Sequence, residues 1–155
     1  MLKDRAWIAG HIPHQGTMCL LDQVLDWDLT RVRCLSRAHR SPQNPLRAHG
    51  RLGIACGIEF AAQAMAVHGA LLGPDPAPHS HVGYLASVRS VTLHATRLDD
   101  IEDDLIATAE RVGGDDSTLL YQFSLSAGVR TLMSGRATVV LNPVSRLQSS
   151  TSVPP

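Results

Sequence analysis

Glu59 is the side chain best placed to do chemistry, because it is a lone carboxylate in a stretch dominated by Ala, Gly and other apolar residues. This stretch runs from Leu52 to Leu72 and reads LGIACGIEFAAQAMAVHGALL. Burial disfavours the charged form of a carboxyl group, so this setting predicts a raised pKa for Glu59. A raised pKa suits proton transfer near neutral pH. We therefore interpret Glu59 as a catalytic acid or base; the alternative is a structural glutamate, paired with an arginine or capping the helix.

Three residues of the same stretch could bind a substrate. Gln63 lies four residues after Glu59 and so shares its helical face, where it could position a substrate or simply hold Glu59. Gly53 and Gly57 lie where the helix should begin, and free backbone N–H groups there could polarise a carbonyl such as that of a thioester. Close packing against a strand explains either glycine equally well.

Two of the eight histidines are candidate catalytic bases. His14 lies in HIPHQGTMCLLD, where Pro13 and Gly16 indicate a turn. His49 lies in NPLRAHGRLG, the loop that leads into the Glu59 helix. Loop histidines placed by rigid elements are common acid/base groups. Each could instead be a turn residue that bonds its own backbone.

The motifs of several other chemistries are missing. No H-x-x-x-H, H-E-x-x-H or closely spaced Cys/His pair occurs, so we predict no metal. Likewise there is no G-x-S-x-G, P-loop or dinucleotide fingerprint. The three cysteines have no pairing pattern of a secreted scaffold and are predicted to be reduced. The N-terminal segment lacks an apolar run typical of a signal peptide, so we expect a cytoplasmic location.

The charges balance globally and separate locally. Fourteen basic and fourteen acidic residues leave no net field, so we expect neither nucleic acid nor an acidic membrane as partner. Between Leu29 and Ile58 there are six arginines and no acid, while the segment 99–116 holds eight acids. Such runs are commonly solvated edges. The alternative is a phosphate-binding rim, in which Arg47 and Arg51 would contact the substrate.

At 155 residues the chain is the size of one domain, which we place at residues 1–142, followed by a flexible polar tail at 143–155. The Leu52–Leu72 stretch could span a membrane by length, yet its Ala/Gly content and central Glu59 favour a buried helix of a globular protein.

Loops are expected at 41–53 and 73–81. Segments with the period of two that half-buried strands show flank the helix. They are LLDQVLDWD, TRVRCLSRA, GYLASVRSVTLHATR, DDLIATAERV, TLLYQFSLSAG and TLMSGRATVVL.

These elements predict an α+β fold in which a curved antiparallel sheet of about five to six strands wraps around one long central helix. Hairpin signals at 113–116 and 127–130 indicate that the last three strands form a meander. The sheet should cover only part of the helix. Because small residues such as Ala62, Ala66 and Gly69 allow close approach, we also expect a dimer.

The sequence resembles the hot-dog β-hydroxyacyl-acyl carrier protein dehydratases of fatty acid synthesis, and more closely their divergent relatives from aryl polyene gene clusters. The likeness covers 12–142 and rests on IPHQGTMCLLDQVLDWD, GIEFAAQAMAVHGALL, HVGYLASVRSVTL and LMSGRATVVLN. Ile58-Glu59 followed by Ala62-Gln63 is the most specific match, and it places Glu59 at the family's catalytic carboxylate. The Gly-His-Phe-Pro loop that carries the family's catalytic histidine does not occur in this sequence. The segment from Asn44-Pro45 to His49-Gly50 resembles the beginning of that loop, and His14 matches the family's earlier Leu-Pro-His turn.

The resemblance implies the hot-dog fold and dehydration of 3-hydroxyacyl chains on acyl carrier protein to trans-2-enoyl thioesters. It also implies a histidine that acts on the α-proton and a carboxyl group that protonates the departing hydroxyl. The substrate would bring its own phosphopantetheine arm or coenzyme A, so no further cofactor is expected. The partner would be a second copy or another hot-dog subunit. A hot-dog acyl thioesterase and a non-catalytic carrier-binding subunit are the alternatives.

Overall fold

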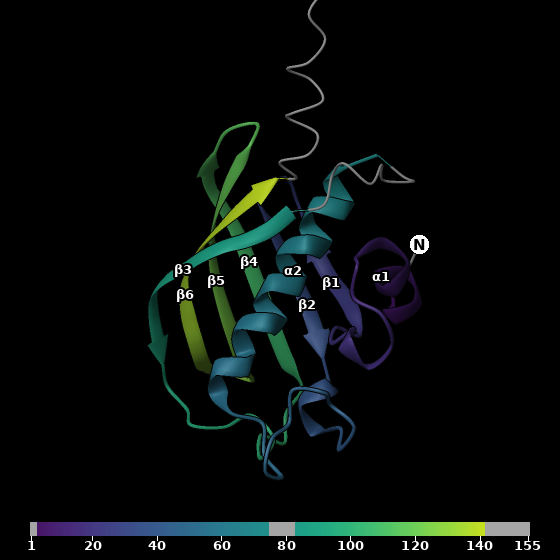
Figure 1. The fold of residues 1–155 in the computed structure, drawn as a ribbon, viewed down its shortest axis with the longest axis vertical. Helices are drawn as coiled ribbons and strands as arrows, with labels where there is room; N and C mark the ends of the chain where they lie inside the picture. Colours follow the sequence, from purple (N-terminus) through teal and green to yellow (C-terminus); the bar gives the residue numbers. More distant parts are fainter. Residues whose placement is uncertain (1–2, 75–82, 142–155) are drawn as a thin grey trace, which may run out of the picture.

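The computed structural model describes residues 3–74 and 83–141 (Figure 1). The predicted tail at 143–155 lies outside these residues, as does most of the predicted 73–81 loop. The described chain forms one antiparallel sheet with a long helix, α2, lying across one of its faces. A short helix, α1, lies beside the edge at β1.

Helix α2 spans Gly57–Leu72 and follows a single 3-10 turn, η3, at Ile54–Cys56. Its buried side chains pack against β2, β4 and β5. The run Ile54–Leu72 is long and apolar enough to cross a membrane by length and composition alone. Its packing against three strands nevertheless makes it the core helix that its Ala/Gly content predicts.

The sheet confirms the predicted strands and their antiparallel pairing. They are β1 (Gln23–Trp27), β2 (Arg31–Ser36), β3 (Gly83–Leu93), β4 (Leu105–Gly114), β5 (Thr118–Ala127) and β6 (Arg130–Leu141). The spatial order is β1-β2-β4-β5-β6-β3, so β4, β5 and β6 form the predicted meander. In this order β3 pairs with β6 and forms the sheet edge opposite β1. Strand periodicity does not predict this pairing.

Three small elements, one short helix and two 3-10 turns, were not predicted from sequence. Helix α1 spans Arg5–His11, and the Asp4 side chain caps it by accepting a hydrogen bond from the backbone N–H of Trp7. Two more 3-10 turns follow, η1 at Gly16–Met18 and η2 at Ala38–Arg40. A seven-residue helix has too few turns for a clear apolar period.

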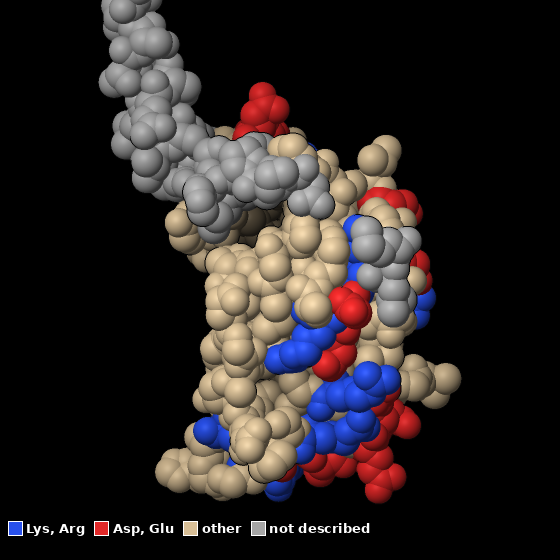
Figure 2. Space-filling model, turned by 90° about the vertical axis from the view of Figure 1, so that its right-hand side faces the viewer, with Lys and Arg blue, Asp and Glu red and all other residues tan. Residues whose placement is uncertain are grey.

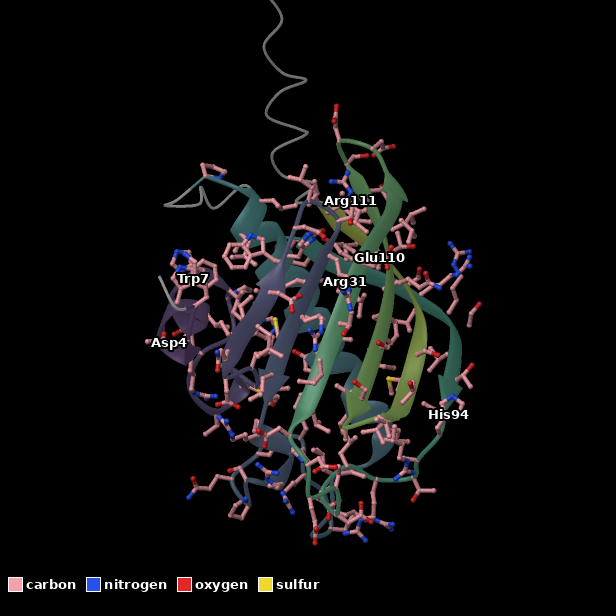
Figure 3. The ribbon with its side chains drawn as sticks, turned by 180° about the vertical axis from the view of Figure 1, so that it is seen from behind. Asp4, Trp7, Arg31, His94, Glu110 and Arg111 are labelled. Carbon is pink, nitrogen blue, oxygen red and sulfur yellow. The ribbon has the colours of Figure 1, made fainter. Side chains whose placement is uncertain are left out.

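The two faces of the sheet differ as strand alternation requires. The inner face, against α2, buries Val32, Cys34, Ala107, Ala109, Tyr121, Phe123 and Leu125. The outer face is polar, with Arg31 directly opposite Glu110 in the β2–β4 register. Figure 3, which views the sheet from behind, shows both of these residues there and no helix of the described chain over this face.

His68, on the later part of α2, is fully buried and fully bonded. A carbonyl can only accept, so His68 Nε2–H donates to the Asp28 carbonyl at 3.0 Å, and Nδ1 accepts from the Tyr121 hydroxyl at 2.8 Å. Burial lowers the pKa of His68 and raises that of Tyr121 to about 12. Both groups are therefore neutral near pH 7, and His68 is a structural histidine.

The β4–β5 hairpin gives a test of the fold. Gly114 has φ +125°, and a Cβ atom there would overlap the carbonyl oxygen of Thr118. Gly114→Ala should lower the free energy of unfolding by about 1–3 kcal/mol, measured by urea denaturation. Gly10→Ala is the matched control, because its Cβ meets nothing within 4 Å; it should be neutral or stabilise by up to about 1 kcal/mol. Equal stabilities of the two variants would contradict the hairpin geometry.

Candidate active site

Glu59 lies in the first turn of α2 with its side chain 32% exposed, so it is neither fully buried nor free in solvent. Two groups contact its Oε1 atom. His14 Nε2 lies 3.1 Å away, and Gln63 Nε2 donates a hydrogen bond of 3.2 Å. No hydrogen bond to Oε2 is formed within the described chain, so this oxygen is available to a ligand.

The turn that contains His14 is held by side chains from both ends of its own segment. The Gln15 amide donates to the carbonyl of Ala9 at 2.9 Å, and the Arg5 guanidinium donates to the carbonyl of Gly16 at 3.1 Å. Gly16 has φ +59°, which suits glycine. Sequence reasoning missed the role of Arg5 and Gln15, because helix α1 was itself not predicted.

Gln63 joins this turn to the helix. Its side chain is fully buried, its carbonyl oxygen accepts from the backbone N–H of Leu20 at 2.9 Å, and its amide donates to the carbonyl of Met18 at 2.7 Å. The remaining amide hydrogen is directed to Glu59. Gln63 therefore positions Glu59 and the His14 turn together, and its polar atoms are all used within the protein.

The predicted rise in the pKa of Glu59 is wrong. The hydrogen bond from His14 outweighs desolvation, and the Gln63 hydrogen bond and the charge of His14 act in the same direction, so the pKa of Glu59 is lowered. Burial is also only partial. In the resting protein Glu59 is a carboxylate that accepts N–H groups from both neighbours. Such a carboxylate can act as a base through Oε2.

The other catalytic and binding candidates do not join this pair. His49 is exposed, has φ +54°, and lies in a tight turn between Ala48 and Arg51. Within the described chain it forms no hydrogen bond or ion pair with Glu59. The backbone N–H of Gly57 donates to carbonyls of the η3 turn. A Cβ atom on Gly57 would lie 2.9 Å from the Leu125 side chain, so close packing explains this glycine. Gly53 lies opposite Arg97 in an isolated bridge.

The arginines predicted to contact the substrate have other positions. Arg47 donates to the carbonyls of Ser41 and His39 at 2.8 and 3.2 Å, so it fastens its own loop. Arg51 is exposed and forms no ion pair within the described residues. Neither contacts Glu59 or His14. The substrate-binding role proposed for these two arginines therefore has no support in the geometry.

The histidine, cysteine and carboxylate side chains form no metal site in the part of the chain that the structure describes, since no three or more of them cluster. Cys19, Cys34 and Cys56 are free thiols. Burial raises the pKa of Cys34 to about 12, which makes it unreactive as a nucleophile. The side chains that the structure brings together are His14, Glu59 and Gln63, and they form a candidate acid/base site.

Comparison with known families decides the classification. The ApeP-like family model, described as ApeP dehydratase, matches residues 7–151. This chain belongs to the ApeP-like dehydratase family. A search of the curated proteins found no match.

Solved structures agree with the fold of this ApeP-like protein. The ApeI:P dehydratase heterocomplex from Xenorhabdus doucetiae contains a chain similar to it, with TM-score 0.78 and 21% identity over 94% of this chain and 97% of that one. A thioesterase from Pseudomonas aeruginosa gives TM-score 0.56 at 11% identity, covering 77% and 80%. A thioesterase from Staphylococcus aureus gives TM-score 0.58 at 15% identity, covering 78% and 93%. These likenesses confirm the hot-dog fold.

The His14–Glu59 hydrogen bond predicts a measurable titration shift. Because the folded-state pKa of Glu59 lies below that of the unfolded chain, ionised Glu59 stabilises the fold above its ordinary pKa. That stabilisation is lost as pH falls through the folded-state value. Carbon-13 NMR of the carboxyl group should give a pKa below the ordinary glutamate value. In His14→Ala it should be higher, and the stability should depend less on pH in the acid range. An unchanged Glu59 titration in His14→Ala would contradict the contact.

Proposed function

We propose that this ApeP-like protein removes water from 3-hydroxyacyl thioesters carried by acyl carrier protein, giving trans-2-enoyl thioesters. In this elimination the Cα–H and Cβ–O bonds break and the Cα=Cβ bond forms. The α-proton must go to a base, and the leaving hydroxyl must gain a proton to depart as water. The observation that supports this function best is the His14–Glu59 pair, held at 3.1 Å within one chain.

The protonation state of the pair suggests which group acts first. Glu59 is ionised and its Oε2 is free, so it accepts the α-proton. Glu59 then holds the proton that the β-hydroxyl needs, and its donation restores the carboxylate. His14 Nε2 and Gln63 Nε2 hold Oε1 throughout. This order differs from the one that the resemblance implies, in which a histidine takes the α-proton.

The reaction can be tested with synthetic 3-hydroxyacyl and 2-enoyl thioesters of pantetheine and of acyl carrier protein, following enoyl absorbance. Glu59→Gln keeps the shape of the side chain and should lower kcat by about 10²–10⁴-fold, because it removes the acid/base group. His14→Ala should move the acid limb of the pH profile of kcat/KM to higher pH, since Glu59 loses the hydrogen bond that lowers its pKa.

His49→Ala is the matched control, because His49 is an exposed loop histidine outside the pair; its activity should equal that of the unaltered protein. The assay is run with the protein alone and with a second hot-dog subunit. If neither preparation forms enoyl product or releases thiol, both enzymatic functions are refuted, which leaves the non-catalytic carrier-binding subunit as the alternative. Full activity of Glu59→Gln would also refute the mechanism.

A second candidate function is hydrolysis of acyl thioesters. It is supported by the ionised state of Glu59, because a carboxylate whose Oε2 accepts no hydrogen bond in the described chain can also activate a water molecule. Thioesterases also occur among the proteins of similar fold. Release of free thiol without enoyl formation, abolished in Glu59→Gln, would identify this activity in place of dehydration.

We propose further that the protein works as a pair of hot-dog subunits, either two copies or a heterodimer. Strand β3 is an edge strand whose second edge is unpaired in the described chain, and it exposes Tyr84, Leu85 and Leu93. On α2, Gly69 is exposed and allows close approach. The similar structure from Xenorhabdus doucetiae is itself a heterocomplex. The cytoplasmic location stays a prediction.

Light scattering after size-exclusion chromatography tests this pairing. The protein, alone or mixed with a dehydratase-type hot-dog subunit, should show the mass of two subunits, and Gly69→Arg should reduce it to that of one. Gly10→Arg is the matched control, since both positions have open space for a side chain and Gly10 lies on α1. A single-chain mass in every preparation, or an intact pair in Gly69→Arg, would refute the proposed interface.

A further inference from the structure

A second polar site lies next to the η1 turn, which directly follows the segment that contains His14. It is a groove of about 290 Å³ between the η1 turn and the segment 37–44. Its polar walls are formed by Arg5, Thr17, Asp22, Arg37, Ser41 and Gln43. Figure 2, which looks at the side of the molecule with α1, shows basic and acidic side chains lying together over the lower part of this face.

The groove offers mainly hydrogen-bond donors. Within the described chain, the side chains of Thr17 and Gln43 form no hydrogen bonds, and the Ser41 hydroxyl only accepts one, from the backbone N–H of Gln43. The Nε atom of Arg37 forms an ion pair with Asp104 at 3.3 Å, so the two terminal nitrogens of its guanidinium group can donate to a ligand. These donors come from both walls and face the same space.

The acids near the groove are already engaged. Oδ1 of Asp22 forms an ion pair with the Arg5 guanidinium at 3.6 Å, and Oδ2 accepts a hydrogen bond from the backbone N–H of Arg37 at 2.7 Å. Asp104 receives both Arg37 and Arg40. The lining of the groove itself holds two guanidinium groups, Arg5 and Arg37, and one carboxylate, Asp22, so it carries one net positive charge. A donor-rich groove with guanidinium groups on both walls suits a tetrahedral oxyanion.

We propose that this groove binds a phosphate group, with Arg37 as its principal contact and Thr17, Ser41 and Gln43 as further donors. The phosphate-binding rim suggested by the arginine-rich segment is thereby assigned to Arg37 in place of Arg47 and Arg51, while Arg5 supports the opposite wall through Gly16 and Asp22. Two sources share this chemistry. One is the phosphate of a phosphopantetheine thioester, which rests on the proposed function; the other is free inorganic phosphate.

The groove and the acid/base pair share the η1 turn. Thr17 of the groove precedes Met18, whose carbonyl accepts from Gln63, and Arg5 fastens the carbonyl of Gly16. A phosphate held there contacts the same turn that holds His14. Because Arg5 supports this turn, it is unsuitable for a binding test, whereas Gln43 is exposed and makes no side-chain bond in the described residues.

Isothermal titration calorimetry with phosphopantetheine, pantetheine and inorganic phosphate tests the site without any turnover, so the result is independent of the proposed reaction. Phosphopantetheine should bind at least about tenfold more tightly than pantetheine. Arg37→Ala should weaken its binding about tenfold, the expected effect of one hydrogen bond to a charged group, and Gln43→Ala about threefold. Binding should weaken as salt increases.

Arg51→Ala is the matched control, an exposed arginine outside the groove, and should leave affinity unchanged within about twofold. Tighter binding of phosphopantetheine than of inorganic phosphate supports the site and identifies the substrate arm as the source; equal affinities support the site and identify free phosphate. Equal affinity for phosphopantetheine and pantetheine, or unchanged binding in both Arg37→Ala and Gln43→Ala, would overturn the proposal.

Discussion

Gln63 is a fully buried polar side chain on an apolar helix, so each of its polar atoms needs a partner within the protein. Its oxygen accepts from Leu20, and its two amide hydrogens are donated to Met18 and Glu59. A substitution that left any of these groups unpaired would cost desolvation energy as well as a contact. The same side chain therefore stabilises the packing of the turn on α2 and sets the geometry of the acid/base pair.

The hydrogen bonds at Glu59 decide what kind of acid/base group it is. Desolvation by itself raises the pKa of a carboxyl group, whereas hydrogen bonds to the ionised form lower it. Here the contribution of His14 is the larger, so the pKa of Glu59 is lowered and the resting group is a carboxylate, which can accept a proton. Dehydration and thioester hydrolysis both begin with such a base, and thioesterases are among the proteins of similar fold. Fold alone thus does not choose between them; membership of a dehydratase family favours elimination.

The separation of charges along the sequence becomes pairing in space. Arg37 and Arg40 from the basic segment both contact Asp104 from the acidic segment, and Arg33 contacts Asp26 across β1 and β2. Exposed ion pairs contribute little to stability, so their main effect is to neutralise part of the basic run, at Arg33, Arg37 and Arg40. In the groove beside the η1 turn, donors outnumber the nearby acids and a local positive charge remains. An arginine-rich sequence therefore does not by itself locate an anion site.

Residue patterns alone determined the strands, the core helix and the choice of Glu59, because alternation with a period of two and a lone carboxylate in an apolar helix are local signals. The spacing of Glu59 and Gln63 likewise predicted a shared face. Tertiary structure decided the rest. It placed His14 against Glu59 and left His49 in an exposed turn, because both positions depend on how α1 and the η1 turn pack on α2. It also set β3 beside β6 and reversed the predicted pKa shift of Glu59, since neither strand order nor a hydrogen bond between residues 45 positions apart is encoded in local sequence.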